Sequence, residues 1–281
     1  MESFAKFDPN DMKAFEPEAK VGLIATVNPV GLPHITLITT LQAKTPSRMI
    51  WAQFSEGMSK KHVGTNPRTA FLIITLDKAL WRGKARWTHL TREGEDYDMF
   101  NEKPMFRYNS YFGIHTVHYL DLVETYGKER LPLASIAIAS LLTGIAQAAA
   151  GRDGGKPILK PWGEGLFNQM SSLKFISWVG EDGFPVLVPL IQCRAADSTR
   201  LVFSTAAYRR ELGAIKEGAS VAVFGLTVNM EDILVRGTFT GIRRYHGIRM
   251  GAVDIAWVYN SMPPASGQIY PEVAVRQVVD F

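Results

Sequence analysis

The residues best suited to chemistry form a basic turn in the first quarter of the chain. The strand-like segment Met49–Gln53 is followed by a loop that contains Gly57, and then by Ser59, Lys60 and Lys61. Serine is a favoured N-cap, so Ser59 predicts the start of a short helix. Free N–H groups at a helix N-terminus bind anions, and the two lysines add positive charge at the same place. The turn therefore indicates a phosphate-binding site, with a solvated basic turn as the alternative.

A second turn of similar chemistry occurs later in the chain. Ser204 and Thr205 end another strand-like segment, and Arg209 and Arg210 follow them. Hydroxyl and basic side chains thus recur after a strand, which favours an anion site. A pair of solvated turns would show the same pattern, so that alternative stays open.

The other reactive residue types give no catalytic arrangement. His115 and His118 stand three residues apart, so in a strand of period two they point to opposite faces and form no joint metal site. The single cysteine, Cys193, excludes an intrachain disulfide framework and a cysteine-built metal centre. No Ser–His–Asp order, paired carboxylates or Walker-type loop stands out. From the sequence we assign no catalytic residue and no metal ligand.

An internal repeat organises the elements that must position these residues. Val21–Ile35 matches Leu173–Leu187, each with two apolar runs around a turn, and Gly31 and Gly183 lie 152 residues apart. Apolar runs around such a turn are typical of a β-hairpin. Further blocks follow in the same order: Met49–Ala52 with Leu201–Ser204, Arg68–Ile73 with Ala219–Phe224, Leu80–Gly83 with Leu234–Gly237, and Gly113–Leu122 with Gly247–Ala256. Ordered blocks at nearly one spacing indicate a tandem duplication.

The repeat sets the fold class and the domain boundaries. Each half has several short strands and few helices, which predicts a small antiparallel barrel or sandwich in a mainly β protein with some α. We expect a first barrel with an N-terminal extension at 1–127, a helical insert at 128–170 and a second barrel at 171–281. Arg82 and Arg236 occupy equivalent strand positions, which predicts a shared type of structural ion pair.

The insert contains a long uncharged segment. From Leu131 to Gly151 there is no charged residue, and about 20 apolar residues suffice to span a bilayer. The segment is nevertheless rich in alanine and carries Ser135, Ser140, Thr143 and Gln147. Larger side chains such as Ile136, Leu141 and Ile145 recur at helical spacing. We therefore expect a helix packed against a core or a partner chain, which would suit a homodimer. A transmembrane span is the alternative.

Composition narrows the class of protein. The 281 residues are 46% hydrophobic and 21% charged, an ordinary globular balance that argues against disorder and collagen-like repeats. The net charge of +4 is too small and too scattered to indicate a nucleic-acid binder. Residues 1–8 include charges and lack the apolar run of a signal peptide. We expect a cytoplasmic protein with neither a nucleic-acid partner nor a membrane partner.

Several motifs together resemble the pyridoxamine 5′-phosphate oxidase-like split barrel, a family of flavin-binding proteins. They are the hairpin end Gly31–Ile35, the strand Met49–Gln53, the turn Ser59–Lys61, and the segments Asn66–Ala70 and Trp81–Gly83. The resemblance covers most of the first half, and the second half carries a weaker version. It implies two tandem split β-barrels, packed as an intrachain pseudo-dimer and joined by the helical insert.

The resemblance also implies a cofactor and its contacts. In that family FMN lies between two barrels, with its phosphate on a Ser/Arg/Lys turn and its ring along the strand after the hairpin. FMN is thus the implied cofactor, and haem or a deazaflavin, which some relatives bind, are the alternatives. The implied contacts are Thr36, Leu37, Ile38 and Thr39 at the ring and ribityl chain, Gln53 and Ser55 close by, and Ser59, Lys60 and Lys61 at the phosphate. The longer basic turn favours a working site in the first half.

The sequence departs from the true oxidase, which limits the function that it implies. That enzyme has basic residues where this chain has Thr36 and, further along the same strand, Thr39 and Thr40. Its C-terminal Trp and Arg, which contact the vitamin substrate, have no match here, so oxidation of pyridoxamine phosphate is not expected. We expect an FMN-binding oxidoreductase-like protein that acts on an unidentified small molecule. The alternatives are a non-enzymatic flavin, haem or deazaflavin binding or sensing protein, and a scaffold with decayed sites.

Overall fold

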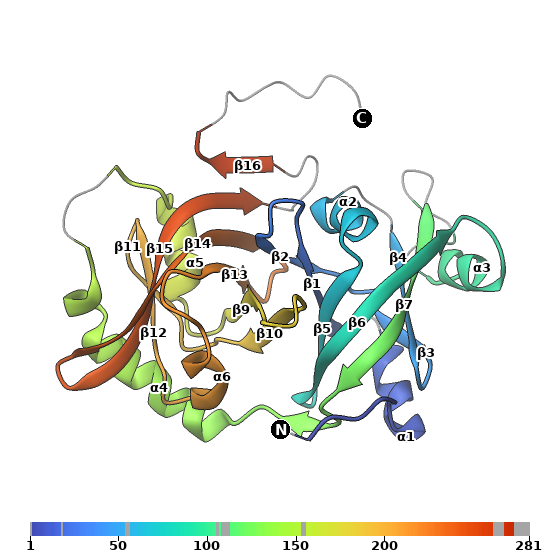
Figure 1. The fold of residues 1–281 in the computed structure, drawn as a ribbon, viewed down its shortest axis with the longest axis horizontal. Coiled ribbons are helices and arrows are strands. Elements are labelled where there is room, and N and C mark those ends of the chain that lie inside the picture. The colour runs from blue at the N-terminus through green and yellow to red at the C-terminus, as the bar shows by residue number, and fades with distance from the viewer. Residues whose placement is uncertain are drawn as a thin grey trace. The chain divides into compact units, whose positions relative to one another are not determined.

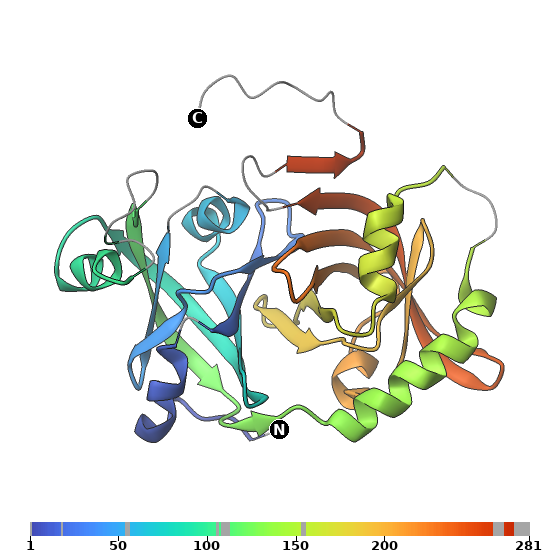
Figure 2. The ribbon, with the colours of Figure 1, turned by 180° about the vertical axis from the view of Figure 1, so that it is seen from behind.

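The structure is a computed structural model that describes residues 2–17, 19–53, 57–104, 107, 113–152, 156–260 and 267–272 (Figures 1 and 2). The chain forms two compact units. Unit 1 comprises Met1–Pro132 and Ser177–Val188, and unit 2 comprises Leu133–Ile176 and Pro189–Phe281.

The apolar runs of the first half form one eight-stranded antiparallel sheet. Its strand order is β2-β1-β5-β6-β7-β4-β3, and β8 pairs with β6. The strands are β1 (Lys20–Val27), β2 (Pro33–Leu37), β3 (Gln42–Thr45), β4 (Arg48–Gln53), β5 (Arg68–Thr75), β6 (Ala79–Thr91), β7 (Thr116–Thr125) and β8 (Glu129–Arg130). Alternate residues face an interior filled by Ile24, Met49, Trp51, Phe71, Trp81 and Leu120, all at most 1% exposed.

The second half repeats this order. Its eight-stranded sheet runs β10-β9-β13-β14-β15-β12-β11, and β16 pairs with β15. The strands are β9 (Leu173–Val179), β10 (Pro185–Pro189), β11 (Arg194–Asp197), β12 (Arg200–Ser204), β13 (Ser220–Leu226), β14 (Asp232–Tyr245), β15 (Ile248–Asn260) and β16 (Gly267–Tyr270). The predicted duplication and the mainly β fold class with some α are therefore confirmed.

Short helices connect the strands. They are α1 (Pro9–Met12), η1 (Lys13–Phe15), α2 (Met58–Thr65), α3 (Glu95–Asn101), α4 (Leu133–Ala146), η2 (Ala148–Ala150), α5 (Pro161–Asn168) and α6 (Arg209–Gly213). In unit 1, α2 contacts β1 and β2, and α3 contacts β7. In unit 2, α4 contacts β12 and β15, while α5 contacts β11 and β13.

The last block of the repeat is displaced by one residue from the sequence match. Trp51 pairs with His118 in the first sheet, and Phe203 pairs with Gly251 in the second. Because Trp51 and Phe203 are equivalent, His118 corresponds to Gly251 in the structure. The sequence match had aligned His118 with Ala252. The prediction was wrong here because strand pairing, and not local similarity, sets the register.

The repeated hairpin depends on a glycine in its turn. The side-chain oxygen of Asn28 accepts hydrogen bonds from the backbone N–H groups of Val30 (3.1 Å) and Leu32 (2.8 Å). Gly31 then adopts a φ of +82°, and its counterpart Gly183 a φ of +76°. Residues with a Cβ rarely adopt such angles, so the glycines fix the same turn in both repeats.

A second shared feature clamps the chain to the backbone of the fourth strand of each repeat. In unit 1 the Thr40 hydroxyl donates to the carbonyl of Ala52 (2.8 Å) and accepts from its N–H (3.0 Å). In unit 2 the corresponding backbone belongs to Ser204. There the Gln192 amide donates to the carbonyl (3.1 Å), and the Thr143 hydroxyl accepts from the N–H (2.8 Å). In unit 2, a glutamine and a threonine of α4 thus make the two backbone hydrogen bonds that a single threonine makes in unit 1.

The predicted apolar helix is present as α4 and packs on the second sheet through one face. Ile136, Ala139, Thr143 and Ala146 are buried at helical spacing, as a helix against a core requires. The Thr143 hydroxyl also donates to the carbonyl of Ala139 at 2.8 Å. In the described part of the chain, no helix combines the length and the apolar character needed to span a membrane.

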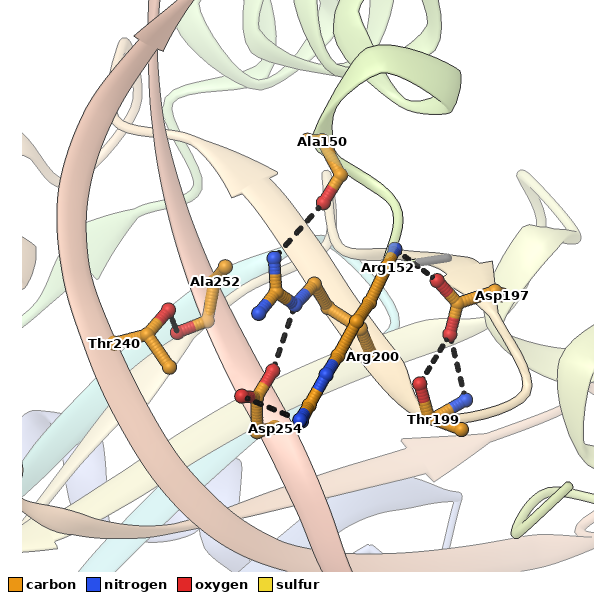
Figure 3. Close-up of polar contacts among 8 residues, drawn as sticks. All are labelled: Ala150, Arg152, Asp197, Thr199, Arg200, Thr240, Ala252 and Asp254. Atoms are coloured by element: carbon orange, nitrogen blue, oxygen red, sulfur yellow. Dashed lines mark hydrogen bonds and ion pairs between the residues drawn. The ribbon is translucent and has the colours of Figure 1, made fainter. Parts of the chain in front are cut away.

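The end of α4 is tied to the sheet by an ion-pair network (Figure 3). Asp254 on β15 accepts from Arg200 Nε (2.7 Å) and from an Nη atom of Arg152 (3.2 Å). Asp197 accepts from the backbone N–H of Arg152 (2.6 Å) and from the N–H and hydroxyl of Thr199 (both 2.7 Å). These contacts fix the segment that follows α4 against β11, β12 and β15.

Replacing Thr143 by valine should weaken unit 2 at this clamp. The isosteric change leaves the buried N–H of Ser204 without its acceptor, so the free energy of unfolding should fall by about 1–3 kcal/mol. Urea denaturation measures the change. Ser140→Ala on the same helix, where the structure gives the hydroxyl no hydrogen bond, is the control and should change little. Equal unfolding free energies for the wild type and Thr143→Val would show that the clamp is unimportant.

Candidate functional site

The basic turn of the first repeat forms helix α2, but its cap differs from the prediction. Gly57 is the N-cap, with extended backbone (φ −171°, ψ 164°), and no side chain among the described residues caps the helix. Ser59 is instead the second residue of the helix, so the prediction that it is the N-cap was wrong. Among the described residues, no side chain therefore accepts a hydrogen bond from the backbone N–H groups of the first turn.

The Ser59 hydroxyl points into the protein. It lies 2.7 Å from the Thr36 hydroxyl and 3.3 Å from the Thr26 hydroxyl. The Thr26 hydroxyl also lies 3.0 Å from Nδ1 of His62, whose ring meets the His34 ring edge-on at 5.2 Å. All five side chains are at most 9% exposed. This buried polar cluster joins α2 to β1 and β2, which explains why Ser59 does not cap its helix.

Lys60 lies at the start of α2. Its Nζ is 3.4 Å from the position that a Cβ on Gly57 would occupy, so the side chain folds back over the helix N-terminus. Lys61, the next residue, is exposed. No side chain of the described residues caps the first-turn N–H groups, and the Lys60 ammonium lies beside them. Gly57 leaves space there because it has no side chain. Together these features fit a phosphate group.

Gln53 belongs to a second buried network beside this turn. Its side-chain oxygen accepts from the Thr116 hydroxyl (2.9 Å) and faces Nε2 of His118 (3.0 Å). The Trp87 indole N–H donates to Nδ1 of His118 (3.2 Å), so the histidine proton lies on Nε2 and is donated to Gln53. The Trp51 ring stacks on His118 at 4.7 Å. The orientation of the Gln53 amide is therefore set by its neighbours.

The His118 ring stays neutral over the usual pH range. Burial, followed by the nearby positive charge of Lys60, lowers its pKa from 6.5 to about 4. His118 is 1% exposed, whereas His115 is exposed and lies just before β7 (Thr116–Thr125), so the prediction that both belong to one strand was wrong.

The remaining predicted cofactor contacts follow the end of β2. Thr36 and Leu37 are its last residues, whereas Ile38 lies beyond the strand and Thr39 lies in a turn. The N–H of Ile38 donates to the carbonyl of Gly22 at 2.7 Å. The expected strand is thus shorter than its sequence implied. Ser55 lies outside the described residues.

The structure brings the predicted residues Thr36, Gln53, Ser59 and Lys60 to the surroundings of α2. The sequence missed the partners that orient two of them: Thr26 for Ser59, and His118 with Thr116 for Gln53. The only available signal was the strand pairing of Gln53 with Thr116, which cannot be read before the sheet order is known. Within the described residues, no group of three or more His, Cys, Asp or Glu side chains could hold a metal ion.

The corresponding turn of the second repeat forms a shorter helix. Helix α6 has five residues, and it is preceded by Tyr208 in the left-handed conformation, at a φ of 50°. Ser204 and Thr205 are buried before it. Like α2, α6 begins without a side-chain cap among the described residues, so the choice of the first repeat for the site stays a prediction.

Comparison with known proteins gives matches among solved structures. No protein-family model and no curated protein matches the sequence. HupZ from Group A Streptococcus is 14% identical over 43% of this chain and 93% of its own, with a TM-score of 0.36. An FMN-binding protein from Syntrophomonas wolfei is 14% identical over 43% of this chain and 83% of its own, with a TM-score of 0.36. A pyridoxamine 5′-phosphate oxidase-like protein from Lactobacillus delbrueckii is 15% identical over 45% of this chain and 99% of its own, also at 0.36.

These proteins belong to the split-barrel group that the sequence resembles. The likeness to each of them covers less than half of this chain.

The state of His118 gives a pH-dependent stability that can be measured. Because its folded-state pKa is lowered, its contribution to stability is complete above about pH 6.5 and is lost as the pH falls toward 4. Between pH 7 and pH 5 the wild type should lose roughly 2 kcal/mol more of its free energy of unfolding than His118→Gln, at 1.36 kcal/mol per pKa unit.

Urea denaturation at both pH values, with His115→Gln as the exposed control, measures this difference. Parallel losses in the wild type and His118→Gln would contradict the assignment of a buried neutral histidine.

Proposed function

We propose that the first repeat binds FMN, with the phosphate at the start of α2, and that the chain is an oxidoreductase acting on a small molecule. The observation that carries the proposal is the position of Lys60, whose ammonium lies over Gly57 at a helix start that no side chain of the described residues caps. An oxyanion there would receive backbone N–H donors and a charge-assisted contact together.

The neighbouring residues would have distinct roles. Lys60 and the first-turn N–H groups would bind the phosphate, and Lys61 would add charge from its exposed position. Ser59 would hold the helix against β1 and β2 rather than touch the phosphate. Gln53, whose oxygen faces Thr116 and His118, would lie close to the ring and the ribityl chain, as the resemblance implies. Thr36 to Thr39 would lie along the ring and ribityl chain, as the resemblance implies.

The redox chemistry would come from the cofactor. FMN, when bound, supplies hydride and electron transfer, while a protein of this kind binds it, orients it and limits access of water. The proposal names no general acid or base, and it leaves the substrate and the electron donor unassigned. A cytoplasmic location and a small-molecule substrate are part of this proposal.

Variants at the start of α2 test the placement of the phosphate. Gly57→Val fills the space beside Lys60, and its extended backbone suits any residue, so FMN affinity should fall at least tenfold while stability is kept. Lys60→Glu should weaken binding further by adding repulsion. Lys13→Glu, the same charge change at an exposed lysine, should bind FMN like the wild type.

Equilibrium titration by flavin fluorescence measures these affinities. Equal FMN affinity of the wild type, Gly57→Val and Lys60→Glu would show that the phosphate does not bind at this turn. Tighter binding of a deazaflavin or of haem than of FMN would favour the binding or sensing alternative.

We also propose that the chain self-associates through α4, since the opposite face of that helix is apolar and exposed. Ile138 (58% exposed), Leu141 (66%) and Ile145 (56%) form a row three and four residues apart, with no charge between them. Contact of this face with its own copy about a two-fold axis would bury apolar surface without burying a charge.

Charges on the exposed face of α4 should therefore prevent self-association. The double variant Ile138→Glu and Leu141→Glu should sediment as a monomer, while Leu76→Glu, at an 80% exposed leucine in unit 1, should keep the mass of the wild type. Sedimentation velocity gives the masses. A monomeric wild type, or a double variant of unchanged mass, would refute the proposal.

A further inference from the structure

The strands β14 and β15 form a two-stranded ribbon that extends beyond the neighbouring strands of the second sheet (Figures 1 and 2). Strand β12 pairs with β15 only as far as Met250, and the ribbon continues past this point to the pair Tyr245 and Ile248. His246 and Gly247 join the two strands with φ angles of 49° and 78°. A two-residue turn with positive φ at both positions matches the twist of its strands, so the tip of the ribbon is a tight, regular hairpin.

The exposed side chains at this tip are basic. They belong to Arg243, Arg244, His246 and Arg249. Arg243 pairs with Glu217 at 3.6 Å, and both of these side chains are about two-thirds exposed. Arg244 and Arg249 are paired directly opposite each other, so their side chains project from the same face of the ribbon. Like charges in this position destabilise a strand pair, and an anion bound across both would relieve the repulsion.

The apolar side chains of the tip point to the other face. Tyr245 and Ile248 are half-buried and pack against a cluster that includes Ala146 and Ala150, at the end of α4, and Met250. The tip, residues 243–249, therefore exposes charged side chains and no large apolar one. A membrane surface or a typical protein interface is bound through apolar groups, whereas a highly charged polymer in water needs none.

Two further exposed arginines lie on the segment that runs beside the ribbon. The backbone N–H of Thr205 donates to the carbonyl of Arg249 at 3.2 Å, and Arg209 and Arg210 follow on helix α6. The fold thus brings arginines from separate parts of the sequence to one region of unit 2. The net charge of +4, from which no nucleic-acid partner was expected, averages over the chain and does not show this local grouping.

We propose that the tip of the β14–β15 ribbon, together with the arginines of α6, binds duplex DNA through its phosphate backbone. A two-stranded β-ribbon fits the major groove of B-form DNA, and a projecting ribbon needs no cavity in the protein to do so. Arginine suits phosphate because its planar guanidinium donates two parallel hydrogen bonds to the phosphate oxygens. This surface lies in unit 2 and does not depend on flavin binding at α2.

Fluorescence anisotropy of a labelled DNA duplex of arbitrary sequence, titrated with the full chain at several salt concentrations, tests the surface. The wild type should bind, and its affinity should fall as the salt concentration rises, because bound arginines release counterions from the DNA. The double variant Arg244→Gln and Arg249→Gln should bind about tenfold more weakly or worse, and its log–log salt slope should be smaller by about 2. Arg92→Gln with Arg130→Gln removes the same charge at two exposed arginines of unit 1 and should bind like the wild type.

Urea denaturation of each variant checks that it is folded, and the exposed positions of all four arginines should leave stability unchanged. Absence of salt-dependent DNA binding by the wild type overturns the proposal. An equal loss of affinity in the two double variants does so as well, because binding would then follow net charge and not the ribbon. Tighter binding to phosphatidylserine vesicles or to polyglutamate than to DNA would also overturn it, in favour of a lipid surface or an acidic protein.

Discussion

Helix α2 is held in place by the buried contacts of the Ser59 hydroxyl with Thr36 and Thr26. These bonds connect the helix to two neighbouring strands, and the pair of His62 and Thr26 reinforces them one turn later. In a buried setting each lost partner leaves an unsatisfied polar group, so the position of the helix is strongly determined. The direction of the N-terminus of α2, and with it the place of Lys60, follows from this cluster.

The two repeats show how one fold can keep its constraints while it changes the residues that meet them. The backbone of the fourth strand is satisfied by Thr40 in one repeat and by Gln192 with Thr143 in the other. The equivalent arginines Arg82 and Arg236 each lie over an aromatic ring, and within the described residues only Arg82 also has a carboxylate partner. The strand order is thus retained while the side chains around it have diverged.

The sequence allowed prediction of the elements whose signals are local. The hairpins follow from apolar runs around Gly31 and Gly183, whose positive φ angles only glycine adopts easily. Helix α4 follows from its spacing of apolar residues. The cap of α2 could not be predicted in this way, because Ser59 bonds to Thr36 and Thr26, which are distant in sequence. The partners of Gln53 were hidden for the same reason, since they depend on the pairing of β4 with β7.

The central claim is that this chain holds a flavin in its first repeat. It is tested most directly by the absorbance spectrum of the freshly purified protein, together with mass spectrometry of whatever heat releases from it. We predict a flavin spectrum and the release of FMN at about one per chain, because the proposal places one phosphate at the start of α2 in the first repeat, where the Lys60 side chain lies over Gly57. A colourless protein that also fails to take up added FMN would contradict the account.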